Sequence, residues 1–256
     1  MMNIKPQMTL LKAQASYRGD PTTIFHQLCG ARPATLLLES AEINSKQNLQ
    51  SLLVIDSALR ITALGHTVSV QALSANGAAL LPLLDEALPP EVRNQARPNG
   101  RELSFPAIDA VQDEDARLRS LSVFDALRTL LTLVDSPADE REAVMLGGLF
   151  AYDLVAGFED LPALRQDQRC PDFCFYLAET LLVLDHQRGS ARLQASVFSE
   201  QASEAQRLQQ RLEQLQAELQ QTPQPIPHQT LENMQLSCNQ SDEEYGAVVS
   251  GLQEAI

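Results

Sequence analysis

The sequence predicts a mixed α+β fold in which antiparallel or mixed sheets carry flanking helices. Runs of apolar and β-branched residues separated by short turn sequences predict strands. Amphipathic segments with capping residues at their ends predict helices between some of these strands. The chain has 256 residues, of which 44% are hydrophobic and 20% charged, and this balance is typical of a folded protein with a sizeable core. Together these observations indicate an α+β architecture.

The first elements are a strand, a helix and a second strand. Residues 9–17 alternate loosely and contain β-formers, which predicts the first strand. Asp20 and Pro21 supply an N-cap and a first helical residue for a helix over 22–29, and Gly30 stands where a glycine ends a helix. The apolar run 34–40 then ends in Glu39 and Ser40, as expected of a buried strand that reaches a sheet edge.

A β-meander is predicted next. Its strands are 51–56, 59–64 and 67–73, with tight turns at Ser57-Ala58 and Gly65-His66. A helix over 78–88 stops before Pro89-Pro90, whose rings cannot continue the hydrogen-bond ladder. The chain from there to residue 121 is predicted to be mostly loop.

The second half repeats the mixture of helices and strands. Ser122 begins an amphipathic helix with Asp125 in its first turn and Arg128 on its polar face. In the apolar run 144–155, Gly147-Gly148 implies a close backbone approach or a bulge. Residues 173–185 and 191–198 read as the two strands of a hairpin.

The C-terminal region predicts a change of domain. The glutamine-rich segment 201–224 keeps a narrow leucine stripe, which predicts a solvent-facing, weakly anchored helix. A proline-rich spacer follows, and Ser241 to Glu244 form a capping box that opens a new helix. We therefore expect one domain over 1–221, a linker over 222–240, and the start of a second, truncated domain over 241–256.

Composition and motifs exclude several functions. Nineteen basic and 33 acidic residues give a net charge of −14, which disfavours nucleic-acid and anionic-membrane partners. The sequence shows no membrane span and no secretory signal, so the expected location is cytoplasmic, with all four cysteines reduced. It also lacks a phosphate loop, a metal-ligand spacing among the four histidines and a nucleophile elbow. We therefore predict no catalytic residue and no metal ligand in this chain.

Three motifs indicate a more specific assignment than composition alone. Residues 34–41 (ATLLLESA), 147–153 (GGLFAYD) and 170–176 (CPDFCFY) resemble the amino-terminal half of anthranilate synthase component I, the large subunit of the bacterial two-subunit enzyme. The resemblance covers essentially the whole chain, and residues 239–245 resemble the opening of the family's chorismate-binding domain.

The resemblance implies an activity for the family. Its members convert chorismate and ammonia to anthranilate and pyruvate, in the first step of tryptophan biosynthesis. They use magnesium and a glutamine amidotransferase subunit that supplies the ammonia. It also implies that the catalytic residues and magnesium ligands lie beyond Ile256. This chain is therefore expected to bind no cofactor itself and to be inactive alone.

The resemblance also implies a tryptophan feedback site at Leu38, Glu39 and Ser40, and an indirect feedback role for Arg128 and Cys174. The chemistry agrees, since a carboxylate accepts from an ammonium group, a hydroxyl donates to a carboxylate, and leucine offers an apolar wall. The alternative interpretation is a strand that ends in two solvated polar residues. Likewise, Arg128 alone would solvate a helix face, and Cys174 alone would fill core.

Two other functions stay open from the sequence. The large subunit of aminodeoxychorismate synthase, an enzyme of folate synthesis, is the second enzyme that fits. The chain is also compatible with a non-catalytic module that binds an amino acid or another protein. Anthranilate fluorescence after incubation with chorismate, ammonia and magnesium separates the enzyme from the binding module.

Overall fold

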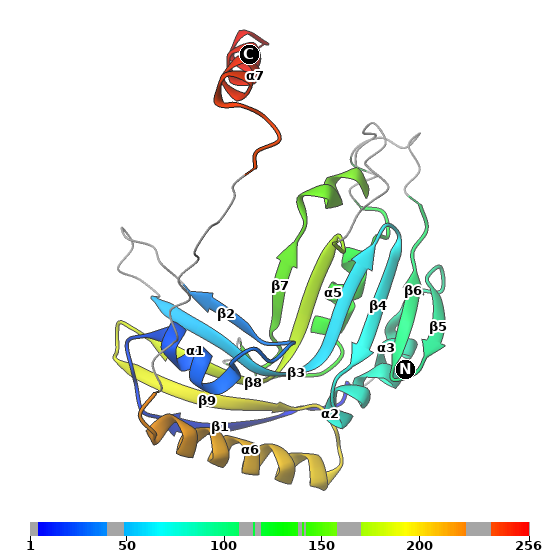
Figure 1. The fold of residues 1–256 in the computed structure, drawn as a ribbon. Coiled ribbons are helices and arrows are strands. Elements are labelled where there is room, and N and C mark those ends of the chain that lie inside the picture. Colours follow the sequence, from blue (N-terminus) through cyan, green and yellow to red (C-terminus); the bar gives the residue numbers. More distant parts are fainter. Residues whose placement is uncertain are drawn as a thin grey trace. The chain divides into compact units, whose positions relative to one another are not determined.

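A computed structural model describes residues 5–39, 49–107, 115, 119–137, 140, 142–157, 170–223 and 237–255. The chain forms two compact units, Met1–Gln224 and Pro225–Ile256. In the first unit, helices pack on one curled antiparallel sheet (Figure 1), so the predicted α+β fold class is confirmed. In the part of the chain that the structure describes, no helix is long and apolar enough to cross a membrane.

The described strands form a single nine-stranded sheet with the main order β1-β9-β8-β3-β4-β6-β5. Two further strands lie off this path, with β2 paired to β3 and β7 paired to β8. Every pairing is antiparallel, and the predicted β8–β9 hairpin is confirmed. The strands are β1 Thr9–Ala15, β2 Leu36–Glu39, β3 Gln50–Leu64, β4 Thr67–Ala72, β5 Arg93–Arg97, β6 Gly100–Ser104, β7 Leu146–Phe150, β8 Phe173–Asp185 and β9 Ser190–Val197.

The helices flank this sheet in the first unit, and one further helix lies in the second unit. They are α1 Pro21–Cys29, α2 Ala75–Ala78, α3 Leu80–Ala87, α5 Phe124–Leu131, the 3₁₀ helix η1 Tyr152–Gly157, α6 Ala202–Gln220 and α7 Asp242–Ala255. The predicted start of α1 is confirmed, because the Asp20 carboxylate accepts from the Thr23 amide at 3.0 Å. The capping box of α7 is confirmed as well, with reciprocal bonds between Ser241 and Glu244.

The predicted turn at Ser57-Ala58 is wrong. Residues 50–64 form one 15-residue strand, β3, and its pairing with β8 shifts register between Val54 and Leu59. Both turn residues are buried, and neither is a glycine or asparagine that would supply the positive φ of a tight hairpin. A bulge therefore bends the strand where a turn would have reversed it.

The predicted loop before residue 121 is also wrong in part, because β5 and β6 pair as a hairpin. All five residues of β5 are exposed, so this edge strand lacks the apolar alternation by which a strand is recognised. Asn99 at φ 54° in the connection adopts the left-handed conformation that hairpin turns use.

The glutamine-rich helix α6 is firmly anchored, contrary to the sequence prediction. The leucine side chains of its stripe are at most 1% exposed, and they pack against the half of the sheet that contains β1 and β9. Side chains of α1 and its approach also hold the end of α6, where Arg18 donates to the Leu219 carbonyl and Gln27 to the Glu218 carbonyl. The buried leucines are Leu208, Leu212, Leu215 and Leu219. Although α6 is polar over most of its surface, its narrow leucine stripe is enough to pack it firmly on the sheet.

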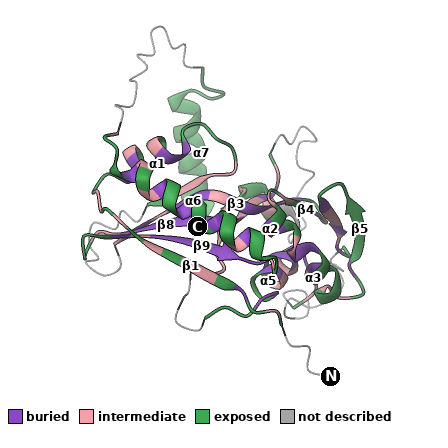
Figure 2. Ribbon diagram, turned by 90° about the horizontal axis from the view of Figure 1, so that it is seen from below, coloured by how far each residue is buried: buried purple, intermediate pink, exposed green. Residues whose placement is uncertain are grey.

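The bend in β3 divides the core into two main clusters. One lies under α2, α3 and α5 and includes Leu59, Leu84 and Phe173. The other lies under α1 and α6 and includes Leu53, Ile24 and Leu212. Figure 2 shows β3, β8 and β9 largely buried, whereas α7 of the second unit is exposed along its length.

Candidate functional site

The predicted effector motif lies on strand β2, which pairs with β3 and forms an edge of the sheet. Leu38 lies opposite Leu52, and Glu39 lies opposite Ser51. The expectation of a buried strand is wrong, because Leu36 and Leu37 are only half-buried and Leu38 is 37% exposed. The exposure of Glu39 agrees with its predicted place at a sheet edge. Among the described residues the Glu39 carboxylate has no hydrogen-bond or ion-pair partner. Ser40 lies outside the described residues.

Strand β7 lies beside β2, which explains the Gly147-Gly148 pair. A Cβ at Gly147 would come within 2.7 Å of Leu36 Cδ2 and 3.8 Å of Leu38 Cδ1. A Cβ at Gly148 would overlap the carbonyl of Cys174 on β8. The predicted close backbone approach is therefore confirmed, and it brings together the three motifs on which the family resemblance rests.

Cys174 is half-buried on β8, opposite Leu149 of β7 and Thr62 of β3. The pKa of Tyr176 is raised above its ordinary value. The larger cause is the burial of Tyr176, and the smaller is its interaction with Cys174. Cys174 thus belongs to the sheet that supports β7 and does not reach the described part of the effector motif directly.

Arg128 lies on α5 and is attached to an aromatic cluster. Its side chain is 67% exposed, pairs with Asp125 at 2.9 Å, and lies 6.0 Å from the Phe124 ring centroid. The Phe124 ring is 5.5 Å from Phe150 at the end of β7, in an edge-on arrangement. Phe150 in turn contacts Phe173 and Phe175, the residues on either side of Cys174. Arg128 is therefore attached to a group of rings that includes both sequence neighbours of Cys174, whereas the Cys174 side chain, which alternates with theirs, lies on the other face of β8.

Ser51, which lies opposite Glu39, is hydrogen-bonded to His186, and His186 is hydrogen-bonded to Tyr17. Ser51 is fully buried, and its hydroxyl lies 2.8 Å from His186 Nε2. His186 Nδ1 lies 2.9 Å from the Tyr17 hydroxyl. The sequence alone indicates no role for His186. A serine at the start of an apolar strand gives no signal of a histidine partner 135 residues away in sequence.

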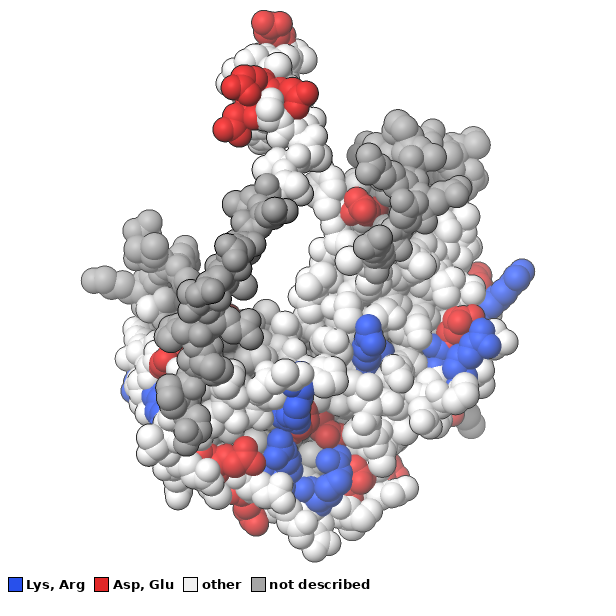
Figure 3. All heavy atoms as spheres, in the orientation of Figure 1, with Lys and Arg blue, Asp and Glu red and all other residues white. Residues whose placement is uncertain are grey.

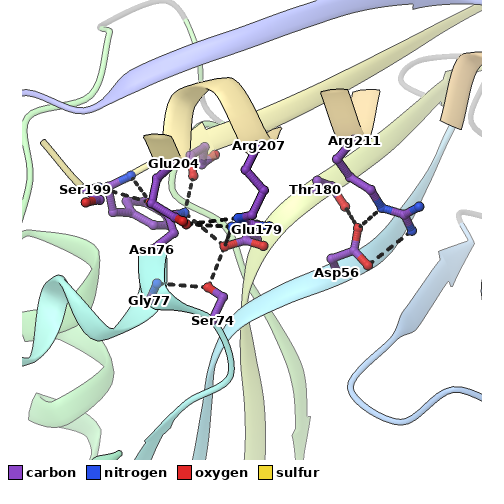
Figure 4. A network of polar contacts seen from close by, with 12 residues as sticks. Asp56, Ser74, Asn76, Gly77, Glu179, Thr180, Ser199, Glu204, Arg207 and Arg211 are labelled. Atoms are coloured by element: carbon purple, nitrogen blue, oxygen red, sulfur yellow. Dashed lines mark hydrogen bonds and ion pairs between the residues drawn. The ribbon is translucent and has the colours of Figure 1, made fainter. Parts of the chain in front are cut away.

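A network of charged side chains at the bend of the sheet was also missed (Figure 4). Glu179 on β8 is 4% exposed and accepts from Ser74, Asn76 and Arg207. Asp56 on β3 accepts from Thr180, Arg32 and Arg211. Two features of the sequence could have indicated this network. Asp56 and Glu179 each lie within an apolar run, and Arg207 and Arg211 are spaced to lie on one face of the predicted helix.

The electrostatics of Asp56 follow from these contacts. Burial would raise the pKa of Asp56, but hydrogen bonds from Arg211 and Thr180 and the charge of Arg211 outweigh it and hold the pKa below its ordinary value. Burial raises the pKa of the nearby Cys29 thiol to about 11. Asp56 is thus held as a carboxylate, while Cys29 stays an unreactive thiol at neutral pH.

The described part of the chain holds no cluster of metal-binding side chains. Within those ranges, no three side chains of histidine, cysteine, aspartate or glutamate gather closely enough to hold a metal ion.

The fold and motifs agree with a comparison against known families. The family model for chorismate binding enzymes matches residues 91–256. The chain therefore belongs to the family of chorismate binding enzymes. The match includes strands of the first compact unit as well as α7 of the second.

Among individual proteins, the chain is strongly similar to anthranilate synthase component 1, which confirms the resemblance inferred from the motifs. It is 94% identical over 255 residues to that protein of Serratia marcescens, covering 100% of this chain and 49% of the relative. It is 59% identical over 256 residues to the protein of Escherichia coli, with the same two coverages. The chain thus spans about half the length of the curated relatives it matches.

One solved structure is that of anthranilate synthase component I from Streptococcus pneumoniae. It aligns with 15% sequence identity and a TM-score of 0.45, over 85% of this chain and 40% of that one.

Proposed function

We propose that this chain is the amino-terminal half of anthranilate synthase component I, and that it works in the conversion of chorismate to anthranilate and pyruvate in the cytoplasm. The observation that carries the proposal is 94% identity along the whole chain to a protein of that name. The relatives reported above do not favour the aminodeoxychorismate synthase alternative.

In this proposal, the reaction of chorismate takes place in the part of the relatives that this chain does not span. The magnesium ion, the chorismate site and the catalytic groups belong there, and a glutamine amidotransferase subunit supplies ammonia. In this division, residues 1–221 are the regulatory domain, 222–240 the linker, and 241–256 the start of the chorismate-binding domain. The 256-residue chain is then inactive alone.

An activity assay tests this division. The chain is incubated with chorismate, ammonium and magnesium, and anthranilate is followed by its fluorescence. We expect no signal above a buffer blank for the chain alone. Co-expression with the second half of the Serratia relative is expected to restore the signal. Anthranilate formation by the chain alone would contradict the division, and failure of the two halves together would count against the assigned activity.

We further propose that Leu38, Glu39 and Ser40 bind tryptophan as a feedback inhibitor. Two findings support this: Leu38 is exposed enough to offer an apolar wall, and the Glu39 carboxylate is free to accept from an ammonium group. Glu179 and Asp56 on the same sheet already accept hydrogen bonds from neighbouring side chains, so a carboxylate without such partners on an edge strand is suited to a ligand.

Arg128 and Cys174 are proposed to act on this site indirectly. Arg128 contacts Phe124, whose ring packs on Phe150 at the end of β7, and Cys174 lies opposite Leu149 of the same strand. Strand β7 in turn lies against Leu36 and Leu38 of β2. A change in the packing of the rings, or of Cys174 against β7, would therefore shift β7 and, through it, β2. This route runs through contiguous contacts, which is one way in which separate sites are coupled.

Ser40→Ala in a protein of the relatives' full length tests the feedback proposal. Losing a hydrogen bond to a charged ligand group costs about 1.5–3 kcal/mol, which weakens affinity roughly ten- to a hundredfold. The inhibition constant for tryptophan is expected to rise by that factor. An unchanged constant, or an uninhibited turnover that falls in step with it, would show that Ser40 is not a dedicated effector contact.

A further inference from the structure

The carboxyl end of helix α6 has no cap of its own. Its last turn contains no basic residue, and neither Gln221, which ends the helix, nor Thr222 after it is a glycine. The last carbonyl groups of a helix have no partner within the helix, so they need donors from other segments. Helix α1 packs beside α6 (Figure 1), and it provides such donors together with the loop before it.

Two side chains, Arg18 and Gln27, donate to the end of α6. Arg18 Nη2 donates to the Leu219 carbonyl at 2.6 Å and to the Gln221 carbonyl at 2.8 Å. Gln27 Nε2 donates to the Glu218 carbonyl at 2.6 Å. Arg18 Nη1 also donates to Gln27 Oε1 at 3.2 Å, so the two side chains hold each other in place. Arg18, Gln27 and the three carbonyl groups they bind are called the α6 clamp below.

The charge of Arg18 is used differently from that of the arginines in ion pairs. Figure 3 shows clusters in which basic side chains lie beside acidic ones. Arg18 has no carboxylate partner within the described ranges, and its guanidinium group donates to neutral carbonyl oxygens. A positive charge at the carboxyl end of a helix complements the helix dipole. The guanidinium group therefore stabilises the last turn of α6 in two ways, by hydrogen bonds and by its charge.

The α6 clamp lies close in sequence to the boundary between the two compact units. The first unit ends at Gln224, and the second begins at Pro225. In the division proposed above, the residues that follow α6 are the linker to the chorismate-binding domain. The clamp therefore determines how firmly the start of this linker is held to the first unit.

The loop that carries Arg18 is also connected to the proposed effector edge. Tyr17 precedes Arg18, and its hydroxyl lies 2.9 Å from His186 Nδ1. His186 Nε2 lies 2.8 Å from the Ser51 hydroxyl, and Ser51 pairs with Glu39 of β2. Side chains of directly opposite residues in an antiparallel pair lie on the same face of the sheet. One short loop is thus attached both to the strand beside Glu39 and to the end of α6.

We propose that Arg18 and Gln27 are positioning residues for feedback inhibition, and that they transmit the binding of tryptophan at the β2 edge to the start of the linker. The proposal rests on the feedback function proposed above for this edge. The element with two states is the last turn of α6, whose carbonyl groups are bound by the clamp in one state and hydrated in the other. Tryptophan shifts this equilibrium only as far as its affinity differs between the two states.

Steady-state kinetics of a protein of the relatives' full length test the proposal. The measured quantity is the coupling factor, which is kcat/KM for chorismate without tryptophan divided by kcat/KM at saturating tryptophan. Arg18→Gln removes the guanidinium group of the clamp, so we expect the coupling factor to fall about threefold or more. Without tryptophan, kcat/KM should change less than about twofold, because the clamp is not assigned to the chorismate site. A smaller fall in the coupling factor overturns this inference.

Two further variants test the rest of the connection. Gln27→Met removes the donor to the Glu218 carbonyl. Tyr17→Phe removes the hydroxyl next to His186 but keeps a ring that packs on the core cluster under α1 and α6. Both variants are expected to lower the coupling factor. Should Arg18→Gln not fold, these two variants decide, and unchanged coupling factors in both overturn the inference.

Arg188→Gln is the matched control for the loss of a positive charge. Arg188 lies in the turn before β9, is 82% exposed and pairs with Asp185 at 3.6 Å. The coupling factor of this variant should equal that of the unmodified protein. A fall as large as that in Arg18→Gln would show a general effect of charge and overturn the inference.

Calorimetric titration of tryptophan distinguishes a positioning role from direct contact with the effector. The Kd of Arg18→Gln for tryptophan should lie within about threefold of that of the unmodified protein, and a larger rise would overturn the positioning role. If the unmodified protein is inhibited by tryptophan and only the clamp variants behave otherwise than expected, this inference fails alone. If the unmodified protein is not inhibited, the feedback function fails and this inference fails with it.

Discussion

Glu39 and Glu179 are glutamates on strands of the same sheet, but their surroundings are opposite. Glu179 is 4% exposed and accepts hydrogen bonds from Ser74, Asn76 and Arg207. Glu39 is exposed on an edge strand and has no partner among the described residues. The comparison separates a carboxylate that holds the fold together from one that is available to a ligand.

The largest effect is expected from removing the buried carboxylate. Glu179→Ala removes the acceptor that Ser74, Asn76 and Arg207 share, although Arg207 keeps Glu204 and Asn76 keeps the Ser196 carbonyl. Losing three hydrogen bonds to one buried carboxylate costs about 3–5 kcal/mol. Glu39→Ala is the matched control and should change the free energy of unfolding by no more than about 0.5 kcal/mol. Urea denaturation of both variants measures the difference. Equal losses would contradict the distinction between the two glutamates.

A similar contrast holds for apolar side chains on the two C-terminal helices. Leu212 of α6 is fully buried, whereas Leu252 of α7 is 61% exposed. Truncation of a buried leucine to alanine costs about 2–5 kcal/mol, so Leu212→Ala should lower the midpoint of urea unfolding clearly. Leu252→Ala should leave it nearly unchanged. A small effect at Leu212 would restore the view of α6 as a weakly anchored helix.

A smaller effect is expected from the titration of Asp56. Because its pKa is lower in the folded protein than the ordinary value near 4, the carboxylate stabilises the fold above that value. The stabilisation is lost as pH falls from about 4 through the folded pKa. Urea unfolding between pH 6 and pH 3 should therefore show a steeper loss in the unmodified chain than in Asp56→Asn. Parallel curves would show that the Asp56 bonds add no net stability.

Local signals in the sequence predicted part of this molecule well. The capped helix α1, the β8–β9 hairpin and the Gly147-Gly148 approach depend on neighbouring residues and on the period of apolar side chains. These signals did not predict that β3 continues across Ser57. That continuity depends on pairing with β8 and on the hydrogen bond from the Ser57 hydroxyl to the Ala34 carbonyl. Tertiary contacts decided there what local propensity left open.

The functional residues divide in the same way, into those that local sequence predicts and those that depend on distant contacts. Leu38 and Glu39 were found through a contiguous motif. Asp56, Glu179, Arg207 and Arg211 were not, since their partners lie 155 and 28 residues apart in sequence. Pairing over such distances becomes visible only when the strands and helix that carry the residues have been placed.

The most direct test of the central claim is the inhibition constant for tryptophan in a protein of the relatives' full length that carries Glu39→Gln. The change keeps the size of the side chain and removes the charge that would accept from the ammonium group. Glu102→Gln, on strand β6 of the same sheet, is the control. The account predicts an inhibition constant raised at least tenfold by Glu39→Gln and unchanged by Glu102→Gln. Equal inhibition constants for both variants and the unmodified protein would contradict an effector role for the β2 edge.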